Sequence, residues 1–147
     1  MVRSQGLTLI EVLASAGVIG ILAAILLPNL LSARDAAQYT AATQQLNTFA
    51  KQLALCLAEG HSLPQDAPPN QAPSGCPDLK WPRNAPFNST YDYENWDLGD
   101  GRRWVGFTFY GKENRRSGIP AHSDLGSGLQ RREVGNNITY SLSFPIH

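Results

Sequence analysis

The sequence predicts an α+β fold, in which one long N-terminal α-helix packs on a small antiparallel β-sheet. Three observations lead to this prediction. Residues 7–33 are almost entirely apolar, residues 39–57 carry an apolar side chain at every third or fourth position, and the last third of the chain alternates apolar and polar residues. The chain has 147 residues, which leaves room for one modest soluble domain once the apolar segment is set aside.

The apolar segment at residues 7–33 carries one charged side chain, the carboxylate of Glu11. About 20 apolar residues span a bilayer, so this segment is long enough to cross a membrane. A carboxylate costs roughly 2.5 to 3.5 kcal/mol at the bilayer centre, and Glu11 therefore needs a partner or a function. Pro28 removes one helical hydrogen bond and is expected to bend the helix axis.

The helical pattern continues after Arg34 and Asp35 with one apolar stripe and an opposite face rich in Gln and Asn. Glu59-Gly60 is typical of a helix end, because glycine readily adopts the left-handed conformation. A single helix of about 50 residues would be about 75 Å long. The predicted stripe consists of Tyr39, Ala42, Leu46, Phe49, Leu53 and Leu57.

A proline-rich loop is predicted after the helix, over residues 60–90, because prolines recur there too often for a helix or a central strand. Cys56 and Cys76 can tether this loop through a disulfide. Two cysteines in an exported domain are typically bonded, and closing a loop of about 20 residues contributes on the order of 3 kcal/mol. Two isolated cysteines are not a zinc site.

Strands are predicted at 104–110 and 138–144, with a weaker pattern at 91–96. The segment 129–134 is expected to form a hairpin with 138–144 through Gly135-Asn136-Asn137. In the last strand, the Ser and Thr residues are expected to face water. The predicted core combines the helix stripe with the sheet and draws on Leu46, Phe49, Leu53, Val105, Phe107, Phe109, Ile138, Tyr140 and Leu142.

The N-terminus admits three interpretations: a secretory signal, a plain membrane anchor, or a prepilin signal. The apolar core is longer than that of a secretory signal, and no Ala-x-Ala site ends it. A plain anchor leaves Glu11 unexplained. The basic leader, the Gly6-Leu7 junction and Glu11 together closely resemble the class III signal of type IV prepilins.

This resemblance implies three parts of the chain: a leader at 1–6 that is cleaved, a membrane and filament-core helix at 7–33, and a globular domain at 34–147. Prepilin peptidase would cut between Gly6 and Leu7, and Leu7 would become the N-methylated terminus. Glu11 would face the amino group of a neighbouring subunit's Leu7, and Pro28 matches the family's kink. The chain departs from the family in having Leu7 where phenylalanine is usual, and in placing its cysteines before the sheet.

The function that the resemblance implies is structural: a subunit of a type IV pilus, a surface fibre for adhesion, twitching motility or DNA uptake. Its partners would be other pilin subunits, the peptidase and the assembly platform. The chain would reside in the inner membrane before assembly, with its C-terminal domain outside the cytoplasm, and in the extracellular pilus afterwards. A pseudopilin of type II secretion is an alternative with the same fold.

Charge distribution suggests a further alternative, a minor pilin that binds DNA. Acidic and basic residues balance at 12 each, but the segment from Arg102 to Arg132 is basic and follows an acidic stretch, Asp92 to Asp100. The simpler interpretation is two solvated loop faces of opposite sign. In the DNA-binding alternative, Trp104 and Tyr110 would stack on bases. The phosphate contacts would come from Arg102, Arg103, Arg115, Arg116, Arg131 and Arg132.

The sequence contains no recognisable catalytic or metal-binding pattern, and we expect neither an enzyme nor a cofactor. His61, His122 and His147 are scattered without ligand spacing. Calcium could bind the oxygen-rich stretch 92–101, which lacks the EF-hand spacing. Asn88-Ser89-Thr90 and Asn137-Ile138-Thr139 match the pattern for N-glycosylation, a weak signal in a bacterial-type export system.

Overall fold

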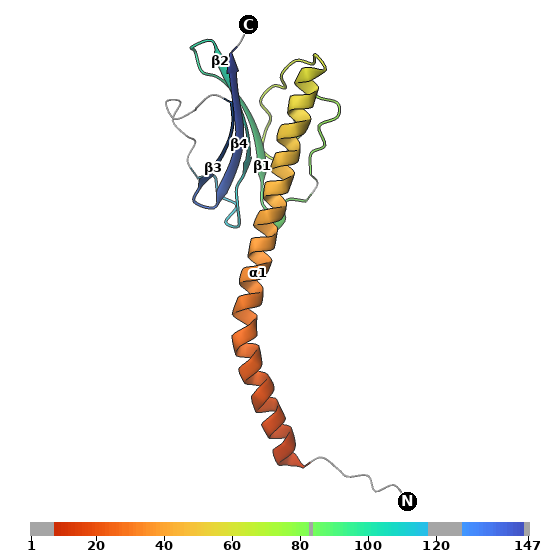
Figure 1. The fold of residues 1–147 in the computed structure, drawn as a ribbon, viewed down its shortest axis with the longest axis vertical. Helices are drawn as coiled ribbons and strands as arrows, with labels where there is room; N and C mark the ends of the chain where they lie inside the picture. The colour runs from red at the N-terminus through yellow and green to blue at the C-terminus, as the bar shows by residue number, and fades with distance from the viewer. Residues whose placement is uncertain (1–7, 83, 118–127, 146–147) are drawn as a thin grey trace, which may run out of the picture. The chain divides into compact units, whose positions relative to one another are not determined.

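The computed structural model describes residues 8–82, 84–117 and 128–145. Within them it contains one α-helix, α1 (Leu9–Ala58), one 3₁₀ turn, η1 (Pro86–Asn88), and four strands (Figure 1). The strands are β1 (Tyr91–Asp97), β2 (Arg102–Phe109), β3 (Gly128–Val134) and β4 (Asn137–Pro145). The predicted α+β class, one long helix and an antiparallel sheet, is confirmed. The chain forms two compact units, Met1–Ala37 and Gln38–His147.

Helix α1 is continuous through Pro28, which lies inside it. The helix ends where the sequence predicts, one residue before Glu59-Gly60. Gly60 has φ +86°, and the N–H of His61 donates to the carbonyl of Cys56 at 3.2 Å. This left-handed cap satisfies a carbonyl that the last turn of the helix would otherwise leave unpaired.

The sheet has the strand order β1-β2-β4-β3, and every neighbouring pair is antiparallel. The predicted hairpin is present as β3–β4, whose ladder begins at the pair Val134 and Asn137. The weakly patterned segment at 91–96 is strand β1, which pairs with β2 along its whole length.

The core of the globular unit lies between the second half of α1 and one face of the sheet. Phe49 is at its centre, with ring centroids 5.2 Å from Trp81, 5.3 Å from Phe107 and 5.7 Å from Tyr91. The predicted helix stripe is confirmed: its central members are buried, and Tyr39 and Leu57 pack against the core from either end.

Two of the predicted core residues are only half-buried: Tyr140, which still packs against the buried cluster, and Leu142, which does not belong to it. Leu142 borders a cavity of about 20 Å³ beside Ala50, whose short side chain does not cover it.

The opposite face of the sheet is less exposed to solvent than predicted. Ser141 and Ser143 of β4 are only 8% and 4% exposed, so the expectation that they face water is wrong. Their register partners on β2 are Gly106 and Trp104. The Trp104 indole lies over Gly106, where an added Cβ would come within 2.3 Å of the ring, and Trp96 stacks on it at 4.5 Å. This aromatic pair forms a second apolar layer on the sheet.

Candidate functional site

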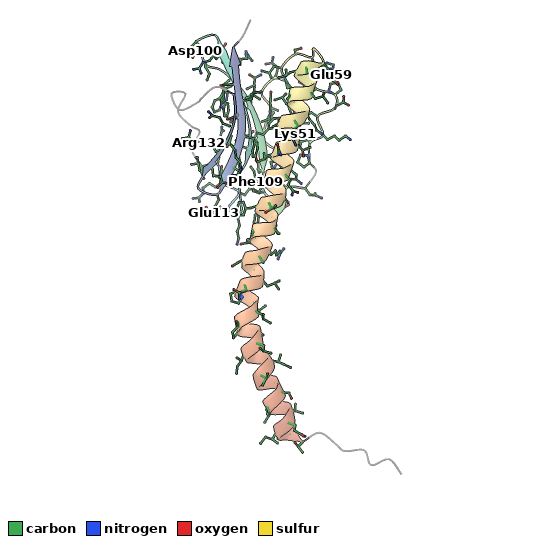
Figure 2. All side chains as sticks on the ribbon, viewed as in Figure 1. Lys51, Glu59, Asp100, Phe109, Glu113 and Arg132 are labelled. Carbon is green, nitrogen blue, oxygen red and sulfur yellow. A yellow bond between two sulfur atoms is a disulfide. The ribbon has the colours of Figure 1, made fainter. Side chains whose placement is uncertain are left out.

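The first half of α1 exposes apolar side chains on every side of the helix (Figure 2). From Leu9 to Leu31, its Leu, Ile and Val residues are all more than half exposed. The helix is long and apolar enough to cross a membrane. Exposed apolar surface of this extent is unusual on a soluble monomer and typically marks contact with lipid or protein.

Glu11 is the charged residue of this apolar surface, and it is held at the start of the helix by Thr8. Its carboxylate accepts hydrogen bonds from the Thr8 backbone N–H at 2.8 Å and from the Thr8 hydroxyl at 2.7 Å. The Glu11 N–H in turn donates to Thr8 Oγ1 at 3.4 Å. This reciprocal arrangement is a capping box, and a carboxylate is also favoured by the helix dipole there. The carboxylate is exposed and both of these bonds use one of its oxygens, so the other oxygen can accept a bond from a cationic group of another molecule.

The predicted processing site, Gly6 and Leu7, lies outside the described residues, and its cleavage stays a prediction. Pro28, the other assembly residue predicted, lies within the apolar part of the helix. Next to it, Ser32 Oγ donates to the Pro28 carbonyl at 3.1 Å, and the Asn29 amide donates to the Ile25 carbonyl at 3.3 Å. These side chains keep their polar atoms bonded to the helix itself.

Cys56 and Cys76 form the disulfide that the sequence predicts. It joins the last turn of α1 to the proline-rich loop, and both cysteines are buried in the core. The loop lies along the free edge of β1, where the N–H groups of Ala67 and Asn70 donate to the carbonyls of Tyr93 and Tyr91. The tethered loop thus covers an edge that would otherwise be open to pairing with another chain.

The six arginines do not gather on one surface. Arg102 and Arg103 are consecutive on β2, and Arg131 and Arg132 are consecutive on β3. Because successive residues of a strand point to opposite faces, each of these pairs is divided between the two faces of the sheet. Arg115 and Arg116 lie in the segment that follows β2.

Four of these arginines are also bound to neighbouring side chains. Arg102 forms an ion pair with Asp100 at 2.6 Å, which raises the arginine's pKa, and Arg103 donates to the Asn95 side chain at 2.9 Å. Two further ion pairs are Arg116–Glu94 and Arg131–Glu133. Much of the basic charge is thereby balanced within the chain.

The acidic stretch is only partly a solvated loop, which corrects the simpler sequence interpretation. Asp92 and Glu94 belong to β1 and are 3% and 7% exposed. They are covered by Tyr110, which donates to Asp92, and by Arg116. Burial raises the pKa of Asp92, although the Tyr110 hydrogen bond and the Arg116 charge oppose the shift.

The suggested calcium stretch has its oxygens bonded to protein groups. Asp97 accepts from the Gly99 N–H, and Asp100 accepts from the backbone and side chain of Arg102. In the described part of the chain, no group of three or more His, Cys, Asp or Glu side chains could hold a metal ion.

The two glycosylation patterns differ in accessibility. Asn88 is exposed, whereas Asn137 is 2% exposed and its amide donates to the carbonyls of Tyr110 and Arg115. Asn137 is therefore a structural residue that ties the β2 exit to β4, and an enzyme could not reach it in the folded chain.

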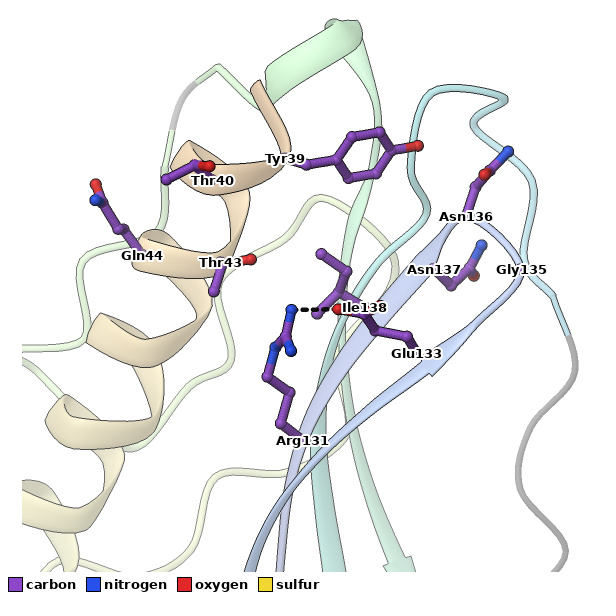
Figure 3. Close-up of a pocket in the computed structure, with 10 residues that line it drawn as sticks. All are labelled: Tyr39, Thr40, Thr43, Gln44, Arg131, Glu133, Gly135, Asn136, Asn137 and Ile138. Atoms are coloured by element: carbon purple, nitrogen blue, oxygen red, sulfur yellow. Dashed lines mark hydrogen bonds and ion pairs between the residues drawn. The ribbon is translucent and has the colours of Figure 1, made fainter. Parts of the chain in front are cut away.

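Sequence reasoning missed a groove between α1 and the β3–β4 hairpin (Figure 3). It has a volume of about 500 Å³. Tyr39, Thr40, Thr43 and Gln44 line it from the helix, and the Arg131–Glu133 ion pair faces them from β3. The signal was present as Thr40, Thr43 and Gln44 at helical spacing, but only the tertiary fold places β3 opposite them.

Comparison with known proteins gives one informative match. The chain is 49% identical over 51 residues to the type IV wide pilus major component PilA4 of Thermus thermophilus. The match covers 35% of this chain and 39% of that protein, so the chain spans about two fifths of the length of its relative. No protein-family model matches the chain, and no solved structure matches it. The resemblance to type IV pilins is confirmed over this segment.

Proposed function

We propose that the chain is a structural subunit of a type IV pilus. The observation that carries this proposal is the first half of α1, an apolar helix that no other described part of its own unit covers and that holds one carboxylate at its start. The similarity to a pilus major component supports it. Before assembly the apolar helix would cross the inner membrane once, with the globular unit outside the cytoplasm. In the filament it would be surrounded by copies of itself.

In this proposal, Glu11 sets the axial position of one subunit against the next. Prepilin peptidase would cut after Gly6 and free the amino group of Leu7. That ammonium and the Glu11 carboxylate of a neighbour are both penalised when left unpaired in an apolar environment, so assembly that joins them is favoured. Thr8 would satisfy the carboxylate until a neighbour arrives.

The other interpretations have less support. A type II secretion pseudopilin would share the helix and the Glu11 site, but the relative that this chain resembles is a pilus component. A DNA-binding subunit would need a continuous basic surface, whereas the arginines lie on both faces of the sheet and are largely paired. A gel-shift titration at two salt concentrations tests this point, because phosphate contacts weaken steeply as salt rises.

The test of the proposal compares Glu11→Ala with Glu59→Ala, which changes a second glutamate just beyond the other end of the same helix. Both variants are expected in the membrane fraction at the wild-type level. Only Glu11→Ala should reduce the filaments recovered by shearing and pelleting. Glu11→Gln should fail as Glu11→Ala does, because the pairing needs the charge. Normal filament yield from both Glu11 variants would contradict the proposed role of the carboxylate.

A further inference from the structure

A second groove on the globular unit is lined by uncharged residues in the described part of the chain. Its volume is about 620 Å³, within the range of small-molecule sites in proteins. Its nine described lining residues include four asparagines, a serine, a threonine and a tryptophan, and none of the nine is ionisable at neutral pH. The groove lies between the proline-rich loop, η1 and the segment that follows β2.

The walls of this groove are fixed by hydrogen bonds to the sheet. Asn70 is bonded to both backbone groups of Tyr91 and donates from its amide to Thr90 Oγ1. Ser89 donates to the Asn114 side chain at 3.3 Å, and the Tyr110 N–H donates to the Thr90 carbonyl at 3.0 Å. A site held in this way loses little conformational freedom when a ligand binds.

Three of the lining asparagines have left-handed backbone conformations. The φ angles are +62° at Asn70, +54° at Asn88 and +48° at Asn114. Asparagine tolerates this region better than most residues, but the conformation is still uncommon outside glycine. Three residues with this uncommon backbone conformation, each from a different segment, therefore line the same groove.

The rim of the groove presents polar groups that the fold does not use. Asn84 and Asn88 are exposed, and their side-chain amides have no hydrogen-bonding partner among the described residues. Each amide offers two donors and a carbonyl acceptor. Trp81 adds an aromatic ring, which is held by stacking on Phe49 with an interplanar angle of 10°.

We propose that this groove binds a neutral carbohydrate. Amides that donate and accept side by side match vicinal hydroxyl groups, and an aromatic ring matches the apolar C–H face of a sugar. Among the described lining residues, no side chain offers an opposite charge to an anionic or a cationic ligand. This inference is independent of filament assembly, since the groove lies wholly within the globular unit.

The test uses the full chain in detergent micelles, after its intact mass has shown that no sugar is attached. Saturation-transfer NMR with lactose and chitobiose measures binding of neutral disaccharides, and glucuronic acid is the anionic comparison. The test variant combines Asn84→Ala with Asn88→Gly, because glycine keeps the left-handed backbone while removing the amide. Asn136→Gly, an exposed asparagine in the β3–β4 turn, is the matched control.

At least one neutral disaccharide should bind saturably, and glucuronic acid should not. Loss of two amides should weaken binding about tenfold or more, whereas Asn136→Gly should leave it unchanged. Circular dichroism of each variant verifies that the fold is retained. Failure of both disaccharides to bind, or equal binding by the test variant and the control, would overturn the proposal.

Discussion

The two halves of helix α1 have the same secondary structure and opposite environments. In the globular unit, Leu46, Phe49 and Leu53 are buried under the sheet, and the exposed face of the helix is rich in polar side chains. In the first unit, Leu, Ile and Val residues of the same helix are exposed on all sides. One sheet is enough to bury a single apolar stripe, but a helix that is apolar on every side needs contacts on every side to bury its surface. The first half is therefore expected to depend on lipid or other subunits.

The largest contrast should come from removing large side chains in the two halves. Phe49→Ala should lower the free energy of unfolding of the globular unit by about 3 to 5 kcal/mol, because it opens a cavity among three aromatic rings. Leu26→Ala should change it by less than about 0.5 kcal/mol. Thermal unfolding in micelles, followed by near-ultraviolet circular dichroism, measures both. Equal losses from the two variants would mean that the halves are not distinct.

A matched pair of charge insertions should affect the first half of the helix and leave the second half unaffected. Leu22 and Leu55 are on the same helix and are 53% and 57% exposed. Leu22→Lys should impair membrane insertion and filament incorporation, since lysine costs about 2.5 to 3.5 kcal/mol at a membrane centre. Leu55→Lys should have no effect on either. Fractionation of cells into membrane and sheared-filament pools distinguishes the two, and wild-type behaviour of Leu22→Lys would refute the membrane assignment.

The disulfide belongs to the covered half, and its loss should be felt only there. Replacing Cys56 and Cys76 together by Ser should cost about 3 kcal/mol and expose the proline-rich loop to proteases. Membrane insertion should be unchanged. The measurements are the melting temperature and the rate of cleavage within residues 61–87. Unaltered values for both would show that the hydrogen bonds of the loop to β1 suffice without the bond.

The smallest expected effect concerns the buried carboxylate on the other face of the sheet. Burial raises the pKa of Asp92 above its ordinary 3.8, so the carboxyl is protonated more readily in the folded chain than in the unfolded chain. Its contribution to stability is present below pH 3.8 and is lost as the pH rises through the folded-state pKa. Asp92→Asn should therefore raise the melting temperature at pH 7, and this gain should shrink as the pH falls toward 3.8. The exposed Asp97→Asn is the control, and a destabilised Asp92→Asn at pH 7 would contradict this balance.

Much of the fold could be predicted because its signals are local. The helix end at Gly60, the stripe through Phe49 and the alternation in β4 each depend on residues close in sequence. The burial of Ser141 and Asp92 could not be predicted from the sequence. It depends on side chains from other segments that cover them, namely Trp104, Tyr110 and Arg116. Alternation distinguishes two faces of a strand, but it does not reveal that both faces are covered.

The candidate functional residues likewise fall into those that could be predicted from local sequence and those that could not. Glu11 is conspicuous in the sequence as one charge in an apolar run, and Thr8 three residues before it completes a local capping pattern. The arginines could not be placed from sequence, since their separation depends on strand register and on partners such as Glu94. The two grooves are formed by segments far apart in the chain, and no short motif marks them.

The most direct test of the filament assignment is mass spectrometry of surface filaments sheared from cells that express this chain. The account predicts that the chain is present in these filaments and that its N-terminus is Leu7, without residues 1–6. Cryo-electron microscopy of the same filaments should show residues 9–31 packed among copies of themselves. The account would be contradicted if the chain kept Met1 to Gly6 and remained entirely in the membrane fraction while filaments assembled without it.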